Sequence, residues 1–262
     1  MKVTIIMPAY NEEKRIGNTL GEYLPYFNSL KKRKKLDYRL LVVINGTTDK
    51  TARVVASWKK MNPSLEYLNL KRGGKGYAII EGFKAALADK KSDLIGFVDA
   101  DGATPPQAFH ALVQGIGKED GIIASRYIQG SIVRPRPSPQ RILASRVYNL
   151  LIRSLFFIPY RDTQCGAKLF KRNAIEHTIK DFKMSQWAFD VDVLYHLRKN
   201  GYSIREAPTI WSDKEYSKIN LASSAPGMAL GIIRLRLLNS PARSFIRIYD
   251  MLIMRTYRKI SR

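Results

Sequence analysis

Two aspartates at the end of an apolar run are the residues of this chain that most suggest chemistry. Asp99 and Asp101 are separated by one alanine and followed by Gly102. Two carboxylates at this spacing repel each other unless a cation shares them. Mg²⁺ and Mn²⁺ prefer oxygen ligands and usually keep places for substrate phosphates. The pair therefore predicts a divalent-metal site, and a solvated acidic turn is the alternative.

Two more polar clusters follow apolar runs. The segment Pro8–Glu12 (PAYNE) could bind a nucleoside through Tyr10 and Asn11, or Asn11 could simply cap a helix. The segment Lys71–Gly76 (KRGGKG) lacks the spacing and the final Ser or Thr of a P-loop, which argues against ATP hydrolysis. Its glycines could still let the backbone and Lys75 approach a diphosphate at the start of a helix.

The elements that must position these clusters alternate along the first half of the chain. Short apolar runs predict strands, and the segments between them have helical length and pattern. The expected strands are Val3–Met7, Tyr38–Asn45, Leu65–Leu70, Asp93–Val98 and Gly121–Ala124, with helices at Glu12–Phe27, Asp49–Met61, Gly74–Ala88 and Pro105–Ile116. This alternation predicts an α/β fold with a mostly parallel, Rossmann-like sheet flanked by helices, whose ligands bind at the carboxyl ends of the strands.

The second half of the chain is less regular. Prolines at alternate positions predict a loop over Arg134–Pro139, and an amphipathic helix is expected over Gln140–Phe157. Mixed structure is expected as far as Asp213. The tail from Ala222 predicts two helices broken near Pro241.

Composition indicates the class of partner. The 262 residues carry a net charge of +23, which predicts attraction to polyanions such as nucleic acid, anionic lipid or phosphorylated ligands. The single cysteine, Cys165, excludes an internal disulfide, and the three histidines lie too far apart in sequence to suggest a zinc site. No apolar run reaches the roughly 18 residues of a membrane-spanning helix, so we expect a cytosolic protein that could bind a membrane face.

The tail points to that membrane face. Residues 222–262 carry eight arginines or lysines and one acid, Asp250, among many apolar side chains. Basic amphipathic helices of this kind lie in a lipid interface, and the apolar residues of Tyr148–Phe157 add a second surface. We therefore predict an anionic membrane surface as a partner; docking of the tail on the protein's own core is the alternative. Lys31–Lys35 is expected to be a solvated helix end.

Eight motifs, in this order, resemble glycosyltransferase family 2, whose members have a single nucleotide-binding domain of the GT-A type. The later motifs are similar to the branch that glycosylates polyprenyl phosphates, the dolichyl-phosphate glucosyl- and mannosyltransferases, and they are closer to the glucosyl type. The resemblance covers most of the chain, roughly Val3–Lys218. The matching pieces are PAYNE (Pro8–Glu12), GTTDKT (Gly46–Thr51), GGKG (Gly73–Gly76), DADG (Asp99–Gly102), SRY (Ser125–Tyr127), DTQCGAKLF (Asp162–Phe170), QWAFDVDVLY (Gln186–Tyr195) and SKI (Ser217–Ile219).

The resemblance implies transfer of a hexose from a nucleotide donor to a polyprenyl (dolichyl) phosphate, by direct displacement with inversion. UDP-glucose is the first expected donor and GDP-mannose the second. Mg²⁺ or Mn²⁺ on Asp99 and Asp101 would hold the donor diphosphate. The donor would also be bound by Pro8, Tyr10, Asn11, Glu12, Asp49 and Lys75.

Two positions leave the chemistry open. Family members usually carry an Asp pair after the second strand, where this chain has Ile44-Asn45, so the nucleotide is not identified. Asp190 falls where the wider family keeps a catalytic base, with Asp192 as the less favoured candidate. A hydroxyl acceptor needs such a base, whereas a phosphate acceptor is already largely a dianion at neutral pH. In the second case Asp190 would bind donor sugar or metal, and capping of the next helix is the structural alternative.

Basic and polar residues are expected to bind the anionic acceptor and the leaving diphosphate, since guanidinium groups hold phosphate with fork geometry. Arg126 is also expected to act in catalysis. For the arginines of the proline-rich loop a solvated position is the alternative, and for Trp187 it is core packing. The expected acceptor-binding residues are Arg126, Arg134, Arg136, Gln164, Trp187, Lys214, Ser217 and Lys218.

Three other functions compete with this interpretation. A nucleic-acid-binding protein would explain the charge but not the ordered motifs. A nucleotidyltransferase would usually show a GxGTR-type loop after the first strand, where this chain has PAYNE. A glycosyltransferase that acts on a sugar hydroxyl of a lipid-linked glycan shares every motif and differs only in its acceptor.

We therefore predict a GT-A domain over residues 1–218, with a nucleotide-sugar half over 1–128 and an acceptor half over 129–218. Residues 219–262 are expected to form membrane-surface helices. The expected location is the cytoplasmic face of a membrane, peripheral and without a transmembrane helix, and nucleic acid is not expected as a partner. The sequence assigns no oligomeric state.

Overall fold

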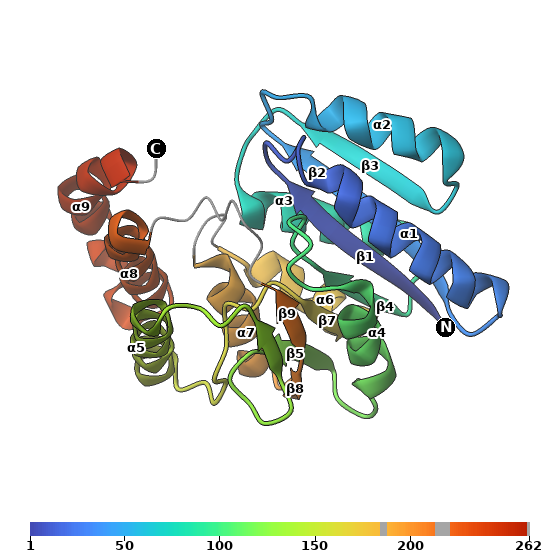
Figure 1. Cartoon of the computed structure of the whole chain (residues 1–262). Coiled ribbons are helices and arrows are strands. Elements are labelled where there is room, and N and C mark those ends of the chain that lie inside the picture. The colour runs from blue at the N-terminus through green and yellow to red at the C-terminus, as the bar shows by residue number, and fades with distance from the viewer. Residues whose placement is uncertain (184–187, 213–220, 261–262) are drawn as a thin grey trace.

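A central sheet of seven strands organises the molecule, and the computed structural model describes it within residues 1–183, 188–212 and 221–260 (Figure 1). The strand order is β3-β2-β1-β4-β7-β5-β8, and only β7 runs antiparallel to its neighbours. The mostly parallel sheet predicted from the sequence is thus confirmed. The strands are β1 (Lys2–Ala9), β2 (Asp37–Asn45), β3 (Leu65–Leu70), β4 (Leu94–Phe97), β5 (Gly121–Ser125), β7 (Lys168–Lys171) and β8 (Ile204–Pro208).

Helices cover both faces of this sheet, which explains why its inner strands are mostly apolar. Along β1, Ile5 and Met7 belong to one buried cluster and Ile6 to the other, as the alternation of side chains in a strand requires. One face is covered by α1 (Ile16–Lys32), α2 (Thr51–Met61) and α4 (Pro106–Gly115), and the other by α3 (Lys75–Ala88), α6 (Arg172–Thr178) and α7 (Phe189–Lys199).

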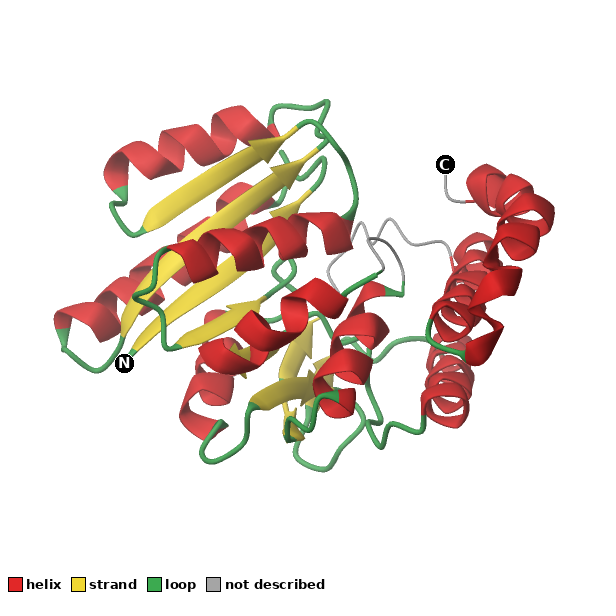
Figure 2. Cartoon of the chain, turned by 180° about the vertical axis from the view of Figure 1, so that it is seen from behind, coloured by secondary structure: helices red, strands yellow, loops and turns green. Residues whose placement is uncertain are grey.

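A further layer of helices lies beyond the strand ends to which the arrows of β1, β2 and β3 point (Figures 1 and 2). It consists of α5 (Pro139–Phe156), α8 (Leu221–Leu238), the short η2 (Pro241–Phe245) and α9 (Ile246–Ile260). Ile232 and Leu235 of α8 are buried in the same cluster as Ile152 and Phe156 of α5. One side of the tail therefore docks on the protein's own core. In the described part of the chain, no helix combines the length and the apolar character needed to span a bilayer.

A small second sheet stands apart from the first. Its two parallel strands are β6 (Ile132–Arg134) and β9 (Ile210–Ser212). The proline-rich loop expected from Arg134 therefore begins at the last residue of a short strand. The backbone amide of Ser212 donates to the carbonyl of Ala103 at 2.8 Å, which ties β9 to the loop that follows β4.

The first helix begins later than expected. The sequence predicts its start at Glu12, but α1 begins at Ile16, because residues 12–15 form a turn in which the Arg15 amide donates to the Glu12 carbonyl at 2.9 Å. Asn11 has a positive φ of 51° and does not cap the helix; its Oδ1 accepts the amide of Thr48 at 2.9 Å. Asn11 therefore joins two loops.

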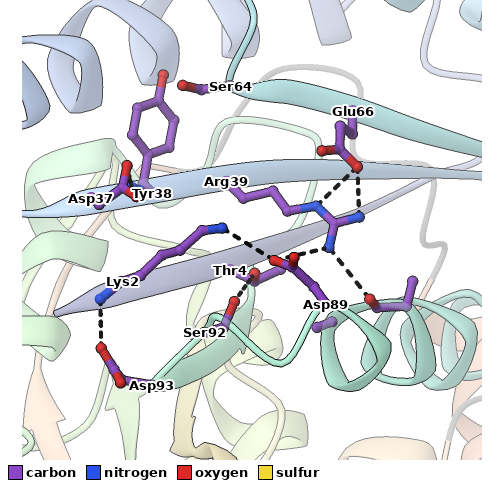
Figure 3. A network of polar contacts seen from close by, with 12 residues as sticks. Lys2, Thr4, Asp37, Tyr38, Arg39, Ser64, Glu66, Asp89, Ser92 and Asp93 are labelled. Carbon is purple, nitrogen blue, oxygen red and sulfur yellow. Dashed lines mark hydrogen bonds and ion pairs between the residues drawn. The ribbon is translucent and has the colours of Figure 1, made fainter.

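Charged side chains close the opposite, amino-terminal edge of the sheet (Figure 3). The backbone amide of Lys2 donates to Asp93 at 2.7 Å, and its ammonium lies 3.1 Å from Asp89. Arg39 lies 2.6 Å from Glu66 and 3.8 Å from Asp89. These charges pair with one another across β1, β2 and β3, so this edge has a structural role.

Gly96 in the centre of β4 provides a test of the packing. A Cβ atom there would lie 2.5 Å from the carbonyl oxygen of Lys168 on the neighbouring strand. We expect Gly96→Ala to lower the free energy of unfolding by about 1–3 kcal/mol or more, because backbone cannot yield as a flexible side chain does. Urea denaturation followed by circular dichroism measures the change.

Gly17→Ala in α1 is the matched control. The nearest atom to its Cβ would be 3.7 Å away, so the gain in helix propensity of up to about 1 kcal/mol should dominate. Equal unfolding midpoints for the two variants would contradict this account of β4.

Candidate active site

The site lies where the strand order reverses, at the carboxyl ends of β1, β2 and β4. Ligands bind at such switch points in open α/β sheets. Asn45, at the end of β2, is buried and connects the loops around it. Its Nδ2 donates to the Ala9 carbonyl at 3.0 Å, and its Oδ1 accepts the amide of Gly74 at 3.0 Å. A carboxylate cannot donate to the Ala9 carbonyl, which is why this position suits asparagine rather than an aspartate.

A close approach of two loops makes Gly46 necessary. It has a φ of +61°, and a Cβ atom there would lie 2.8 Å from the backbone nitrogen of Gly73. The glycine-rich segment after β3 is thus held against the end of β2. This contact brings the start of α3, and with it Lys75, to the site.

The loop after β1 is held by the loop after β2. The amide of Glu12 donates to Thr51 Oγ1 at 2.7 Å, and that of Glu13 donates to Asp49 Oδ2 at 3.1 Å. Asp49 Oδ1 accepts the Thr51 amide at 2.9 Å. Tyr10 is 52% exposed at the start of this loop, so its ring is accessible to a base. Of the residues predicted to bind the nucleotide-sugar donor, Tyr10 therefore has an accessible ring, and Asp49 holds the loop in shape.

Two other residues predicted to bind the donor, Pro8 and Glu12, make their contacts within the protein. Pro8 is buried inside β1 and belongs to the packed interior. The carboxylate of Glu12 accepts two hydrogen bonds of 2.6 Å from the Arg15 guanidinium. Pro8 therefore contributes to packing, and Glu12 shapes the loop.

A chain of alternating charges forms the centre of the site. Lys75 Nζ lies 2.7 Å from Asp99 Oδ1 and 3.8 Å from Asp190 Oδ2. Asp190 Oδ1 in turn accepts from Lys168 Nζ at 2.6 Å, and Lys168 also donates to the Cys165 carbonyl at 2.6 Å. Asp190 does not cap α7, since its carboxylate binds these two lysines. The chain joins β4, α3, β7 and α7.

The pKa values of these groups follow from burial and pairing. Burial opposes the charge on Asp190, but Lys168 and Lys75 outweigh it and hold the pKa of Asp190 below its usual value. Burial also opposes the charge on Lys75, yet Asp190 and Asp99 hold the pKa of Lys75 above its usual range. The pKa of Asp99 is raised by burial, with Lys75 opposing the shift and Asp101 adding to it. Lys75 is thus a fixed cation, and Asp190 is a weak base.

The carboxylates of Asp99 and Asp101 fit a divalent cation. Asp101 Oδ1 accepts the Ala103 amide at 2.9 Å, and among the described residues Oδ2 of either aspartate accepts no hydrogen bond. Among the described residues, Lys75 and Lys168 offset two of the three negative charges on Asp99, Asp101 and Asp190, which leaves one without a described cationic partner. The described residues contain no group of three His, Cys, Asp or Glu side chains that could hold a metal. The arrangement therefore suits a cation held by two carboxylates and completed by ligand oxygens.

Neighbouring backbone fixes the two aspartates. Thr19 Oγ1 donates to the Ala100 carbonyl at 2.8 Å, and Tyr23 OH donates to the Thr104 carbonyl at 2.7 Å, so α1 supports the loop from below. Gly166 lies directly against the Asp99 carboxylate. A Cβ atom there would be 1.9 Å from Asp99 Oδ2, so only glycine leaves this carboxylate in place.

Arg126 is held by a buried carboxylate beside this centre. Asp162 accepts the Arg126 backbone amide at 2.9 Å and its Nε and a terminal nitrogen at 2.8 and 2.9 Å. The guanidinium also lies 5.2 Å from the ring of Trp211, which is cation–π distance. Asp162 outweighs burial and keeps the pKa of Arg126 above its usual value. Arg126 is therefore a rigid cation.

The remaining predicted acceptor residues are distributed as follows. Arg134 and Arg136 are exposed in and after β6, which agrees with the solvated alternative. Gln164 lies in the loop before β7, and its buried Nε2 has no hydrogen-bond partner among the described residues. The predicted residues Trp187, Lys214, Ser217 and Lys218 lie outside the described residues.

Sequence reasoning missed Lys168 and Asp162 as functional side chains. Both are completely buried, and each pairs with a residue that the sequence did single out, Asp190 and Arg126 respectively. The sequence did contain a signal for both: Lys168 and Asp162 belong to one motif next to apolar residues of β7. Charges that are buried with such residues require partners. Asp192 is also structural, since its carboxylate lies 2.8 Å from His196 Nδ1 and accepts the Lys183 amide at 2.6 Å.

Cys165 is not a nucleophile. Its side chain is buried, and burial together with the charge of Asp162 raises the pKa of its thiol to about 11. The thiol therefore stays protonated at neutral pH, in agreement with the predicted packing role.

Comparison with known proteins identifies relatives over most of the chain. The model of the family described as Glycosyl transferase family 2 matches residues 4–179 of this chain. A dolichyl-phosphate beta-glucosyltransferase of Dictyostelium discoideum is 31% identical over 245 residues, which are 89% of this chain and 73% of that protein. The dolichyl-phosphate beta-glucosyltransferase of Homo sapiens is 33% identical over 233 residues, 83% of this chain and 69% of that one.

Solved structures share the fold at lower identity. Glucosyl-3-phosphoglycerate synthase from Mycobacterium tuberculosis, in complex with Mn²⁺, UDP and phosphoglyceric acid, has a TM-score of 0.64 at 15% identity and covers 90% of this chain and 77% of its own. Mannosyl-3-phosphoglycerate synthase from Rubrobacter xylanophilus has a TM-score of 0.63 at 19% identity, with 93% and 75% covered. The predicted GT-A, Rossmann-like architecture is thereby confirmed.

The buried pair of Lys168 and Asp190 generates a test of the charge chain. We expect Lys168→Met to lower the free energy of unfolding by about 3 kcal/mol or more at pH 7, because it leaves a buried carboxylate with only Lys75 nearby. The folded-state pKa of Asp190 is lowered, so the stabilisation is present above the usual aspartate pKa near 4 and is lost as the pH falls through the folded value. The difference between wild type and variant should therefore narrow below about pH 4.

Lys171→Met on the same strand is the control. Its ammonium is partly exposed and lies 4.0 Å from Asp120, so the loss should stay under about 1 kcal/mol. Urea unfolding at neutral and acid pH measures both variants. A deficit for Lys168→Met that does not depend on pH would contradict an ionic origin.

Proposed function

This chain belongs to glycosyl transferase family 2, and from that premise we propose that it transfers glucose from UDP-glucose to a polyprenyl phosphate, dolichyl phosphate in particular. It is a glycosyltransferase. The observation that carries the proposed acceptor is the charge chain around Asp190, whose lowered pKa suits an acceptor that is already ionised. Two relatives that share at least 31% identity and most of their length with this chain are named for the same sugar and acceptor.

The proposed reaction inverts the anomeric centre. UDP-glucose has its glucosyl group in α linkage, and the names of the relatives specify a β product. One direct displacement converts α into β, whereas a covalent glycosyl-enzyme intermediate would retain the configuration. The oxygen of the acceptor phosphate forms the new bond to the anomeric carbon, and UDP leaves with the electron pair of the old one.

The donor half of the site supports this assignment. Tyr10 presents an accessible ring for a base, and the glycine-rich start of α3 places backbone amides and Lys75 within the site. The positive end of a helix and a fixed ammonium suit a diphosphate. GDP-mannose is the second donor that we propose to test, because Asn45 is occupied with backbone groups and leaves the base unspecified.

We further propose that Asp99 and Asp101 hold Mg²⁺ or Mn²⁺. The metal, when bound, would offset charge on the leaving diphosphate. The support is the negative charge of this cluster that no described cation offsets, together with the Oδ2 atoms of both aspartates, which accept no hydrogen bond from described residues. Lys75 on Asp99 restricts the orientation of that carboxylate.

The acceptor half needs fixed cations more than it needs a base. Arg126 is rigid because Asp162 holds its guanidinium on one side. Gln164 contributes a buried amide nitrogen that has no partner among the described residues, and an oxygen of the substrate would satisfy it. A phosphate monoester has its second pKa near 6 and is largely a dianion at neutral pH, so it attacks without a base.

A sugar hydroxyl of a lipid-linked glycan is the competing acceptor. It would require proton removal, and an efficient base has a pKa near the working pH. Lys168 and Lys75 instead hold the pKa of Asp190 below its usual value, further from the working pH. We therefore propose that Asp190 positions Lys75 and Lys168. Nucleic acid is not favoured as a partner, because the family motifs account for the site.

A lipid acceptor places the reaction at a membrane surface. We propose that this is the cytoplasmic face, where nucleotide sugars are available and where a lone, buried Cys165 stays reduced. The outward side of the helical layer formed by α5, α8 and α9 is the part of the molecule that we assign to this surface.

The first test measures sugar transfer directly. Purified protein is incubated with short-chain polyprenyl phosphate, a divalent metal and labelled UDP-glucose, GDP-mannose or UDP-N-acetylglucosamine in separate reactions. We expect label in the organic phase from UDP-glucose, and a loss on the order of 100-fold or more in Asp101→Asn or with a chelator. Asp89→Asn, at the opposite edge of the sheet, is the control that should keep activity. Transfer from none of the donors would refute the proposed acceptor.

The second test separates the two acceptor classes by pH. With a phosphate acceptor, we expect the rate to rise through about pH 6 as the dianion forms. Replacing the phosphate by a phosphonate, whose second pKa is higher, should move this rise to higher pH. A rise that stays in place would assign the ionisation to the enzyme and restore a base such as Asp190.

A further inference from the structure

Exposed apolar side chains are concentrated in the layer of helices beside the sheet. Of the fifteen large apolar residues that the described structure exposes, nine lie on α5 and the residue after it, α8, η2 and α9. On α5 they are Leu143, Val147 and Leu150, with Phe157 following it. A soluble surface usually scatters such residues singly, and a gathered patch marks an interaction site.

This layer is a single packed unit. Tyr148 on α5 donates to the carbonyl of Met228 on α8 at 3.5 Å, and Arg234 of α8 pairs with Asp250 of α9 at 2.8 Å. The two tail helices are therefore held together and against α5. Their exposed apolar residues are Ile233, Phe245, Ile248, Met251 and Leu252.

The apolar stripe of α5 borders a basic pocket. Leu143, Val147 and Leu150 recur at spacings of three and four residues, so they share one face of the helix. Arg146 and Arg153 lie along one edge of that face. They line a pocket of about 350 Å³ together with Tyr127, Asn149, Leu150 and Arg161.

The guanidinium groups of these three arginines form no ion pair with a carboxylate among the described residues; only the backbone amide of Arg161 donates to Glu206, at 2.9 Å. The ion pairs of the described structure include Arg126 with Asp162 immediately beside it, but none for Arg146, Arg153 or Arg161. Three guanidinium groups around one hollow repel each other, and an anion between them relieves that repulsion. Guanidinium groups match phosphate in geometry as well as in charge.

We propose that this pocket, here called the α5 arginine pocket (Arg146, Arg153 and Arg161), binds the phosphate of an anionic membrane phospholipid, while the apolar residues of α5 and α9 enter the bilayer. An amphipathic helix buries its apolar face about 5–10 Å into the boundary between head groups and acyl chains. Lipid phosphates lie at this boundary, and the pocket adjoins the stripe through Leu150, which belongs to both. The net charge of +23 favours an anionic bilayer over a neutral one.

The inference goes beyond the proposed reaction, because vesicle binding is measured without turnover. It assigns the pocket to the bilayer and not to the acceptor. A protein that fails to transfer glucose can still bind vesicles, so failure of one proposal leaves the other measurable.

The test measures co-sedimentation of the full chain with vesicles of phosphatidylcholine, with and without phosphatidylglycerol, at low and high salt. Each arginine near an anionic surface adds roughly fivefold to binding. We therefore expect R146Q/R153Q/R161Q to lose on the order of 100-fold in partitioning to the anionic vesicles at low salt. The KM for detergent-dispersed polyprenyl phosphate should stay unchanged.

A charge-matched control distinguishes the pocket from net charge. K32Q/R33Q/K35Q removes the same charge from the exposed end of α1, away from the apolar layer, and should lose less than tenfold. V147S/L150S tests the bilayer as occupant, because only insertion of the stripe makes binding depend on these side chains. We expect this variant to bind both kinds of vesicle at least tenfold more weakly.

Three results would overturn the proposal. Equal losses in the pocket variant and the α1 control would show that net charge alone governs binding. Unchanged vesicle binding in V147S/L150S would exclude insertion of α5. Normal vesicle binding with a raised KM for the dispersed acceptor would assign the pocket to the acceptor phosphate instead.

Discussion

The alternation of charges from the partly exposed Asp99 and Lys75 to the buried Asp190 and Lys168 is the constraint on which the site depends. Lys75 lies between Asp99 and Asp190, and Asp190 lies between Lys75 and Lys168. If one of these side chains moved, its neighbour would therefore lose a partner. Breaking a buried pair costs far more than a surface pair contributes. The chain therefore fixes β4, α3, β7 and α7 relative to one another before a ligand arrives. An enzyme that works by positioning and by fixed charge needs such a preorganised site.

The backbone around this chain is arranged to bring these elements close. Gly166 leaves room for the Asp99 carboxylate, and Gly46 lets the glycine-rich loop approach β2. Asn45 then uses both ends of its amide to hold that loop and the end of β1. At the opposite edge of the sheet, exposed charges pair with one another and bind the strand starts together (Figure 3). The charges of the two edges therefore differ: those at the amino-terminal edge pair with one another, whereas those at the site leave one negative charge that no described cation offsets.

Docking of the tail on the core and the proposed contact with a bilayer are compatible in this structure, although the sequence alone left the two as alternatives. Ile232 and Leu235 on one side of α8 are buried in the core, so the tail docks on its own protein. Ile233 on the same helix is exposed, as are Phe245 and Met251 on the elements that follow. A helix has enough circumference to pack one face inward and to leave another outside. Because the tail is docked on the core, its exposed apolar side chains would meet a bilayer as one rigid face.

The sequence by itself determined most elements of the first half of the chain and the family to which the chain belongs, because both depend on local patterns. Buried parallel strands are mostly apolar runs, and so Tyr38–Asn45 was predicted to within one residue of the bounds of β2. The Asp99–Gly102 motif was found for the same reason. Only the tertiary structure decided which charges neutralise each other. Lys168 meets Asp190 because β7 enters the sheet antiparallel between β4 and β5, and no periodicity predicts that order. A strand's neighbours are chosen by packing across the whole sheet, whereas its existence depends on the few residues within it.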